Sequence, residues 1–297
     1  MSELPVQLPF HRRTWMTLEP IHATVYFSPL AGPAYESIGL VGREGYFAGR
    51  SAALGTPCAE VVISTFFNFS PELVRECIPH AWSTATPDQI LATRQQFVSA
   101  TFAAHCADHV NSEATARAAQ LAKSIALDAS TRIDGRPLFA AHAALPWPDD
   151  SNASLVLWHA QTLLREYRGD GHIAVLVAEG LSGIEAHVAH IATGTMPVEM
   201  MRGTRAWSEP DYQRAVDRLI ERGLVARTDE GTSLTEAGAA QRQRIEDLTD
   251  SLSAAPYIAA GEAACAELRQ VGRPLSQAIV DAGMSPLRKL PPADAPA

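Results

Sequence analysis

Lysine is almost missing from this sequence of 297 residues. Lys123 and Lys289 are its two lysines, and arginine carries the rest of the positive side-chain charge. The formal net charge is −9, and the pI is about 5.6. Proteins that bind duplex DNA take most of their non-specific affinity from cations that face phosphates. The overall charge therefore disfavours a nucleic-acid partner unless a local basic patch offsets it.

Long apolar runs and paired cysteines are also lacking. No apolar stretch reaches the length of a membrane span, and the first dozen residues lack the apolar segment of a secretory signal. The four cysteines are far apart, as expected for buried thiols in a reducing compartment. A hydrophobic content of 46% is typical of a globular protein. We expect a cytoplasmic protein with no membrane contact.

Motifs that would announce a cofactor are missing as well. The sequence has no phosphate-binding loop, no dinucleotide fingerprint, no zinc-protease motif and no nucleophile elbow. Two histidine pairs, His187 with His190 and His105 with His109, lie about one helical turn apart. Each pair would need a third ligand to hold a metal, and the sequence indicates none. We therefore predict neither a cofactor nor a metal site.

Helix start signals recur along the chain. Ser70-Pro71-Glu72, Thr86-Pro87-Asp88 and Ser208-Glu209-Pro210 each combine an N-cap residue with proline and an acid in the first turn. A mainly α fold follows from these signals and from the apolar spacing. Helices are expected at 15–27, 70–82, 86–109, 112–129, 153–167, 172–179, 184–192, 208–222 and 236–253, a strand or buried helix at 60–69, a hairpin at 223–234, and irregular chain at 193–207.

The two halves of the chain align with each other. His22-Ala23 and His159-Ala160 are 137 residues apart, and Phe69-Ser70 and Trp207-Ser208 are 138 apart. Gly32 and Gly169, also 137 apart, are expected to sit in matching turns that end a helix. A repeat of this length with the element order kept predicts an internal duplication.

The second half resembles the winged helices of the multiple-antibiotic-resistance regulator (MarR) type. The residues that carry the resemblance are Leu219, Gly223-Leu224-Val225, Arg227, Leu234-Thr235 and Gly238. They match the recognition helix, the wing and the helix after it, and the resemblance covers 153–253 when the opening helix is counted.

Most of the chain also resembles a poorly characterised actinobacterial helix-turn-helix-related family. Its recurring pieces match residues 19–23, 46–50, 66–69 and 145–148, and it implies no particular activity.

These resemblances imply a fold of two tandem, degenerate winged-helix-like units that form an intramolecular pseudo-dimer. We expect a wingless N-terminal repeat at 1–133, a proline-rich linker at 134–150, a MarR-like repeat at 151–282 and a flexible tail at 283–297. One chain of this kind is either a monomer or half of a homodimer.

The surface that would read DNA departs from the family pattern. The expected recognition helix 208–222 holds four acidic residues against three arginines, and Arg227 on the wing lies beside Asp229 and Glu230. About fifteen residues, 193–207, separate this helix from the previous one, whereas a helix-turn-helix needs a turn of three or four. The acidic balance and the long separation therefore argue against DNA as a partner.

Candidate site residues come from the matched helices and from polar residues among aromatics. His22 and His159, with Tyr26 one turn after His22, are candidate catalytic groups, because histidine can carry a proton near neutral pH. The alternative is that they are core histidines. Arg50, which follows two aromatics, and Asn68, which interrupts three, suit an acidic or carbonyl ligand in an apolar pocket. The predicted ligand-binding residues are Tyr46, Phe47, Arg50, Phe67, Asn68, Trp158 and His187.

The sequence predicts a small-molecule-binding protein with an apolar pocket between the two repeats. It leaves open whether the protein only binds or is a cofactor-independent enzyme of specialised metabolism. The alternative is a MarR-like, ligand-responsive transcriptional regulator that binds DNA through Arg214, Arg218, Arg222 and Arg227.

Overall fold

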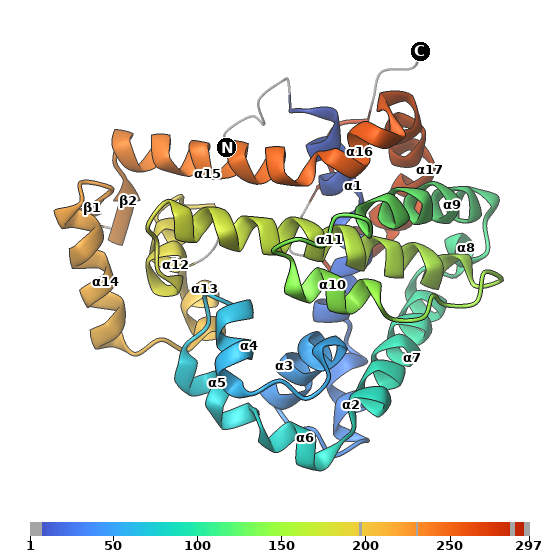
Figure 1. The fold of residues 1–297 in the computed structure, drawn as a ribbon, viewed down its shortest axis with the longest axis horizontal. Helices are drawn as coiled ribbons and strands as arrows, with labels where there is room; N and C mark the ends of the chain where they lie inside the picture. Colours follow the sequence, from blue (N-terminus) through green and yellow to red (C-terminus); the bar gives the residue numbers. More distant parts are fainter. Residues whose placement is uncertain (1–7, 196–197, 230, 286–288, 294–297) are drawn as a thin grey trace.

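The computed structural model describes residues 8–195, 198–229, 231–285 and 289–293. It is mainly helical, as predicted, and none of the described helices is both long and apolar enough to cross a membrane (Figure 1). The elements are α1 Phe10–Phe27, α2 Ala31–Glu36, α3 Arg43–Ser51, η1 Ala52–Leu54, α4 Ala59–Thr65, α5 Pro71–Cys77, α6 His80–Thr84, α7 Pro87–His105, α8 Ala107–Val110, α9 Glu113–Ala129, α10 Pro137–Ala143, α11 Ala153–Ala178, α12 Gly183–Ile191, α13 Val198–Arg205, α14 Glu209–Glu221, β1 Val225–Thr228, β2 Gly231–Leu234, α15 Glu236–Ser253, α16 Ala255–Ala260 and α17 Glu262–Asp281.

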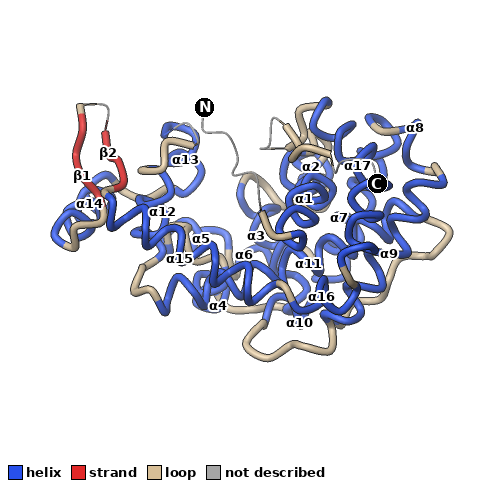
Figure 2. Tube along the Cα trace, turned by 90° about the horizontal axis from the view of Figure 1, so that it is seen from above, coloured by secondary structure: helices blue, strands red, loops and turns tan. Residues whose placement is uncertain are grey.

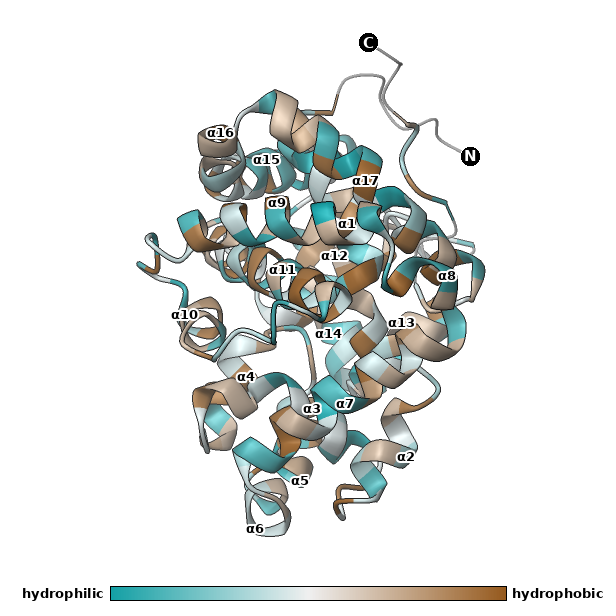
Figure 3. Ribbon diagram, turned by 90° about the vertical axis from the view of Figure 1, so that its right-hand side faces the viewer, coloured by the Kyte–Doolittle hydropathy of each residue, from teal (hydrophilic) through white to brown (hydrophobic). Residues whose placement is uncertain are grey.

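Helix α11 runs across the middle of the molecule, with α15 alongside it and α1 packed against it (Figure 1). It lies at the centre of Figure 3, where hydrophobic segments gather. The helices predicted at 153–167 and 172–179 are one continuous helix, so the predicted break at 168–171 is wrong. Arg168 Nη1 donates to Asp250 Oδ1 at 2.8 Å, and Asp170 Oδ2 accepts from the backbone N–H of Phe139 at 2.9 Å. These tertiary contacts outweigh the weak helix propensity of the two glycines.

Buried side chains form two separate hydrophobic cores. The larger core contains residues from 18–167 and 257–284, and the smaller core contains residues from 175–245. Figure 2 shows the smaller core's elements, α12 to α15 with the hairpin, at one end of the molecule. Because α17 packs on α1, the last described helix closes the larger core.

The predicted linker 134–150 contributes to the larger core. It contains α10, whose Leu138 and Phe139 are buried. The larger core therefore continues across this segment, and the predicted domain boundaries stay a prediction. The predicted tail 283–297 lies partly outside the described residues.

In the first half, most start signals are confirmed but some helices are shorter than expected. Thr86 forms a capping box with Gln89 at the start of α7. The helix expected at 70–82 divides into α5 and α6, and the one at 86–109 into α7 and α8. The segment 60–69 begins as helix α4. The matching helix-ending turns predicted for Gly32 and Gly169 are wrong, because Gly32 lies in α2 and Gly169 within α11.

The smaller core holds two consecutive helices in helix-turn-helix order, α13 and α14, followed by the β1–β2 hairpin. Helix α13 occupies the segment predicted to be irregular, so only residues 206–208 separate it from α14. The prediction that no tight turn precedes the helix at 208–222 is therefore wrong. Ala206 adopts φ 56°, a conformation that normally favours glycine, and the Ser208 side chain accepts from the Asp211 N–H to cap α14. Strands β1 and β2 pair antiparallel, with Val225 opposite Leu234, as the hairpin prediction required.

Candidate functional site

Four predicted site residues come together inside the larger core. His22 and Tyr26 lie one turn apart on α1, and Tyr46 and Arg50 lie one turn apart on α3. The Arg50 Nη1 donates to the Tyr46 hydroxyl at 3.0 Å. The guanidinium carbon of Arg50 is 5.3 Å from the ring centre of Tyr26 and 5.5 Å from that of Tyr46. With Thr162 on α11, these residues form what we name the polar cluster: His22, Tyr26, Tyr46, Arg50 and Thr162.

A chain of hydrogen bonds fixes the protonation of His22. Thr162 donates its hydroxyl hydrogen to the backbone oxygen of Trp158 at 3.0 Å, so its oxygen accepts from His22 Nδ1 at 3.1 Å. The Nδ1 atom therefore carries the proton, and Nε2 accepts from the Tyr26 hydroxyl at 2.8 Å. Helices α1 and α11 are joined through this chain.

His22 and Tyr26 are both neutral at pH 7. Burial lowers the pKa of His22 well below 6.5, and the nearby charges of Arg165, Arg94 and Arg50 lower it further. Burial also raises the pKa of Tyr26 to about 12, although Arg50 acts in the opposite direction. His22 therefore does not change charge near neutral pH, and its predicted role in proton transfer stays a prediction.

Sequence reasoning missed three charged or titratable residues beside this cluster. Arg94 on α7 is 2% exposed, donates to the Gly49 oxygen at 3.3 Å and lies 5.1 Å from the Trp158 ring centre. Arg165 on α11 pairs with Glu19 at 3.4 Å. His142 on α10 has a pKa well below 6.5 because of burial and the charge of Arg94.

A sequence signal for Arg94 did exist. Ile90, Phe97 and Val98, one turn before and after it, are all buried, so Arg94 interrupts the apolar face of α7. A cation on the buried face of a helix needs a partner or a function.

The aromatic residues around Asn68 divide between the two cores. Phe47 is fully buried in the larger core. The ring centre of Phe66 lies 4.1 Å from the Arg50 guanidinium carbon, so Phe66 takes the place predicted for Phe67. The backbone oxygen of Asn68 accepts from Trp207 Nε1 at 3.0 Å. The Ser70 N–H donates to the backbone oxygen of Arg205 at 2.9 Å. The loop 66–70 therefore joins the polar cluster to the turn of the helix-turn-helix.

The remaining predicted site residues lie in different places. Trp158 is next to Arg94, as described. His159 faces Trp147, with ring centres 4.7 Å apart, and burial lowers its pKa to about 4. His187 is in the smaller core, 6.5 Å from the Tyr212 ring, so the structure places it apart from the polar cluster.

The arginines of the helix-turn-helix surface are paired with acids or with backbone. Arg214 pairs with Asp211, Arg218 with Glu185 at 2.9 Å, and Arg227 with Asp217 at 2.6 Å. Arg222 donates to the Gly180 oxygen at 3.0 Å. Phosphates would have to displace these partners, so little free positive charge faces a possible duplex.

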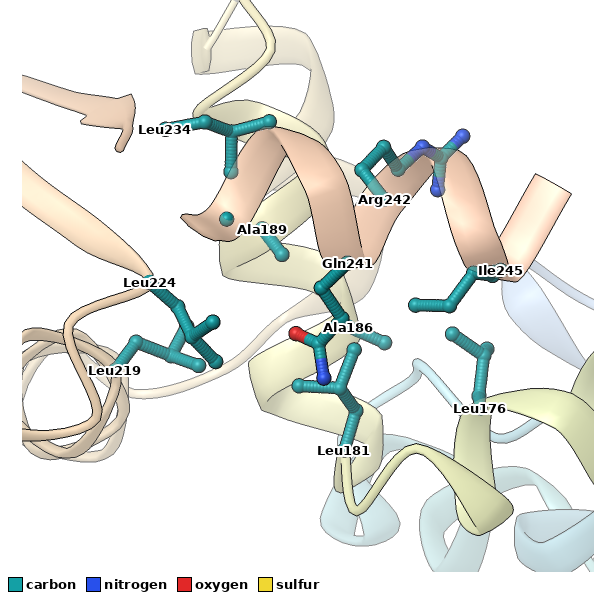
Figure 4. A pocket seen from close by; sticks show the side chains of 11 residues that line it. Leu176, Leu181, Ala186, Ala189, Leu219, Leu224, Leu234, Gln241, Arg242 and Ile245 are labelled. Carbon is teal, nitrogen blue, oxygen red and sulfur yellow. The ribbon is translucent and has the colours of Figure 1, made fainter. Parts of the chain in front are cut away.

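Two hollows lie away from the polar cluster. A small apolar pocket lies between α12, α14 and α15, where Leu181, Leu219 and Ile245 converge (Figure 4). Its volume of about 10 Å³ holds one water at most. A hollow of about 510 Å³ on the outer face of α7 is bordered by Gln95 and Gln96 and by no charged side chain. Among the described residues, no group of three or more His, Cys, Asp or Glu is placed to bind a metal.

Comparison with known proteins agrees with a helix-turn-helix in the smaller core. The model of a helix-turn-helix family matches residues 11–286. No curated protein and no solved structure matches the chain. The family match includes the larger core and its polar cluster as well as the helix-turn-helix itself. The chain therefore belongs to this helix-turn-helix family.

Proposed function

We propose that this protein binds a small molecule at the polar cluster. The observation that carries the proposal is the setting of Arg50, whose guanidinium lies against the rings of Tyr26, Tyr46 and Phe66. Within the described residues, no carboxylate forms an ion pair with Arg50. A cation held by aromatic rings and one hydroxyl is typical of a site that binds an acidic or carbonyl group.

A cofactor-independent reaction at this site is part of the same proposal. The ordered chain from Tyr26 through His22 to Thr162 holds the Tyr26 hydroxyl in one orientation. Because the Tyr26 hydroxyl hydrogen is donated to His22, the guanidinium of Arg50 is the group that can donate to a carbonyl oxygen as negative charge develops there. His159 is not connected to this chain by a hydrogen bond among the described residues, so we assign it no step.

The test is removal of a single hydroxyl. Tyr46→Phe keeps the ring beside Arg50 and removes the hydrogen-bond acceptor of Arg50, so we expect ligand affinity to fall by about tenfold. Ligands are found by screening small acids and carbonyl compounds for a rise in melting temperature. His190→Gln, which alters the other core, is the matched control. Hits that respond equally in Tyr46→Phe and the parent protein would contradict the proposal.

We further propose that the two halves are related by duplication and form a pseudo-dimer within one monomeric chain. The support is that matched positions meet. Ser70 follows Phe69 as Ser208 follows Trp207, and the two turns exchange hydrogen bonds through Asn68 and Arg205. The opening helices of the halves, α1 and α11, also pack together. A MarR-like relationship for 153–253 rests on the wing and the helix order.

A second candidate function is a ligand-responsive transcriptional regulator. The three-residue turn between α13 and α14, the wing and the family match favour it. The loop 66–70 would connect the polar cluster to the turn through Trp207 and Arg205. The acid-paired arginines of α14 and the wing argue against strong DNA binding.

A gel-shift experiment separates the two functions. With the neighbouring promoter as duplex at 50 mM salt, we expect no specific complex, because α14 carries more acids than arginines. A salt-sensitive complex that is lost on Arg218→Ala, and retained on Arg117→Ala at a site outside the smaller core, would establish the regulator instead.

A further inference from the structure

Several buried nitrogen donors beside the polar cluster have no acceptor. Among the described residues, Arg50 Nε, Arg94 Nε and Trp158 Nε1 are buried without a hydrogen-bond partner. Arg94 and Trp158 are 2% and 5% exposed. Buried polar atoms are nearly always hydrogen-bonded, because leaving one unpaired costs about 1–3 kcal/mol. Sixteen buried side-chain atoms of the described residues lack a partner, and these three nitrogen donors are among those that lie beside the polar cluster, where an acceptor from outside the chain could pair with them.

These donors belong to one place in the fold. Arg94 Nη1 donates to the oxygen of Gly49, the residue before Arg50, and the Arg94 guanidinium carbon is 5.1 Å from the Trp158 ring centre. A ring nitrogen of His142 hydrogen-bonds the backbone of Arg50, while its Nε2 has no partner among the described residues. Helices α3, α7, α10 and α11 therefore supply these groups to a common region.

The charges of this region do not cancel. Arg50, Arg94 and Arg165 contribute three positive charges, Arg205 lies near enough to act on Arg50, and Glu19 and Glu166 contribute at most two negative charges. Both glutamates lie beside Arg165, at 3.4 and 3.6 Å. Burial raises the pKa of Glu19, which reduces its negative charge further. An uncompensated buried charge is strongly unfavourable, so at least one negative charge is needed for balance.

We infer that the ligand of the polar cluster carries a carboxylate, which Arg50 and Arg94 bind together with the indole N–H of Trp158. The inference rests on the proposed function and names its ligand class. A carboxylate has two oxygens that accept several hydrogen bonds and a negative charge, which match the unpaired donors and the excess of positive charge. A neutral amide would leave the region positive, and a phosphate would bring more oxygens than the three unpaired donors require.

The ligand reaches this region from the side of Arg50. Arg50, Tyr26 and Tyr46 are each partly accessible, whereas Arg94 and His142 are closed off from solvent. The carboxylate therefore lies at the inner end, and the rest of the ligand lies among the rings of Tyr26, Tyr46 and Phe66. An aromatic or conjugated acid fits these flat apolar surfaces.

The experiment compares matched small probes on the full chain by calorimetry. The probes are acetate and benzoate, their neutral amides acetamide and benzamide, and the dianions inorganic phosphate and phenyl phosphate. We expect benzoate to bind at least tenfold more tightly than benzamide and phenyl phosphate. Arg94→Gln should weaken benzoate binding at least thirtyfold. It should leave the unliganded protein as stable as before or more stable, because it removes an unpaired buried charge.

Arg117→Gln is the control, since Arg117 forms an exposed pair with Glu267 and should leave binding unchanged. Equal affinity for benzoate and benzamide, lost in Tyr46→Phe, would overturn the carboxylate inference and leave the proposed function standing. Preference for the dianions would also overturn it. Failure of every probe to bind would overturn the inference and count against the proposed function. An unchanged benzoate affinity in a folded Arg94→Gln protein would remove Arg94 from the site.

Discussion

Lowering the pH from 7 to 5 is expected to unfold this protein. Six histidines are held neutral because desolvation strongly lowers their pKa. The value is well below 6.5 for His22 and His142, and about 4 for His159, His172, His187 and His190. Since the unfolded chain binds protons near pH 6.5 and the folded chain does not, stability is complete above pH 6.5 and falls as the pH drops toward 4.

The size of this effect approaches the whole stability of a typical domain. Each histidine is expected to cost about 2 kcal/mol at pH 5, so six give roughly 12 kcal/mol against a usual total of about 5–15 kcal/mol. Asp170 acts in the opposite direction, because burial raises its pKa to about 6. It returns only about 1 kcal/mol between pH 7 and 5.

Melting temperature measured by circular dichroism from pH 8 to 4.5 checks the prediction. His187→Leu provides a matched variant, because neither ring nitrogen of His187 has a hydrogen-bond partner within the described residues. Removing one titrating group is expected to lower the acid midpoint by about 0.3 pH unit. A melting temperature that is the same at pH 7 and pH 5 would show that these histidines are protonated in the folded state.

Gly183→Ala is expected to lower the free energy of unfolding more than any other added methyl group at the junction between the two cores. A Cβ at Gly183 would lie 1.8 Å from the Phe67 carbonyl oxygen and 2.8 Å from its carbonyl carbon. Both contacts are with backbone, so no side-chain rotation relieves them. Phe67 itself has φ 24°, which leaves its loop little freedom to move. We expect a loss of about 3 kcal/mol in the free energy of unfolding.

Urea unfolding of the Gly183→Ala and Gly203→Ala variants measures the effect. Gly203→Ala is the control, because nothing lies within 4 Å of its Cβ position and it sits in helix α13. Alanine there should stabilise the helix by about 0.5–1 kcal/mol. Equal stability of Gly183→Ala and the parent protein would mean that α12 does not rest on the loop 66–70.

Local chemistry predicted the α fold and most helix starts. Capping residues such as Thr86 and Ser208 act within one turn, so their effect is readable from neighbouring residues. The hairpin at 225–234 was predicted for the same reason. Helix α13 was missed because Gly194 and Gly203 interrupt its segment and the turn after it uses Ala206 in place of glycine.

The candidate site was predictable only in part. His22, Tyr26, Tyr46 and Arg50 lie one turn apart in two pairs, and the sequence indicates each pair. Their meeting, and the addition of Arg94 from α7, depends on how three helices pack. His187 looked equivalent to the others in sequence and lies in the other core.

From the sequence alone came most element types, the hairpin and the acidic balance of α14, because these depend on propensity, capping and composition. Tertiary structure alone decided that α11 continues through 168–171 and that a three-residue turn precedes α14. It also decided which arginines lie together without carboxylate partners. The physical reason is that burial and charge compensation are properties of residues distant in the chain, and no local pattern of side chains contains them.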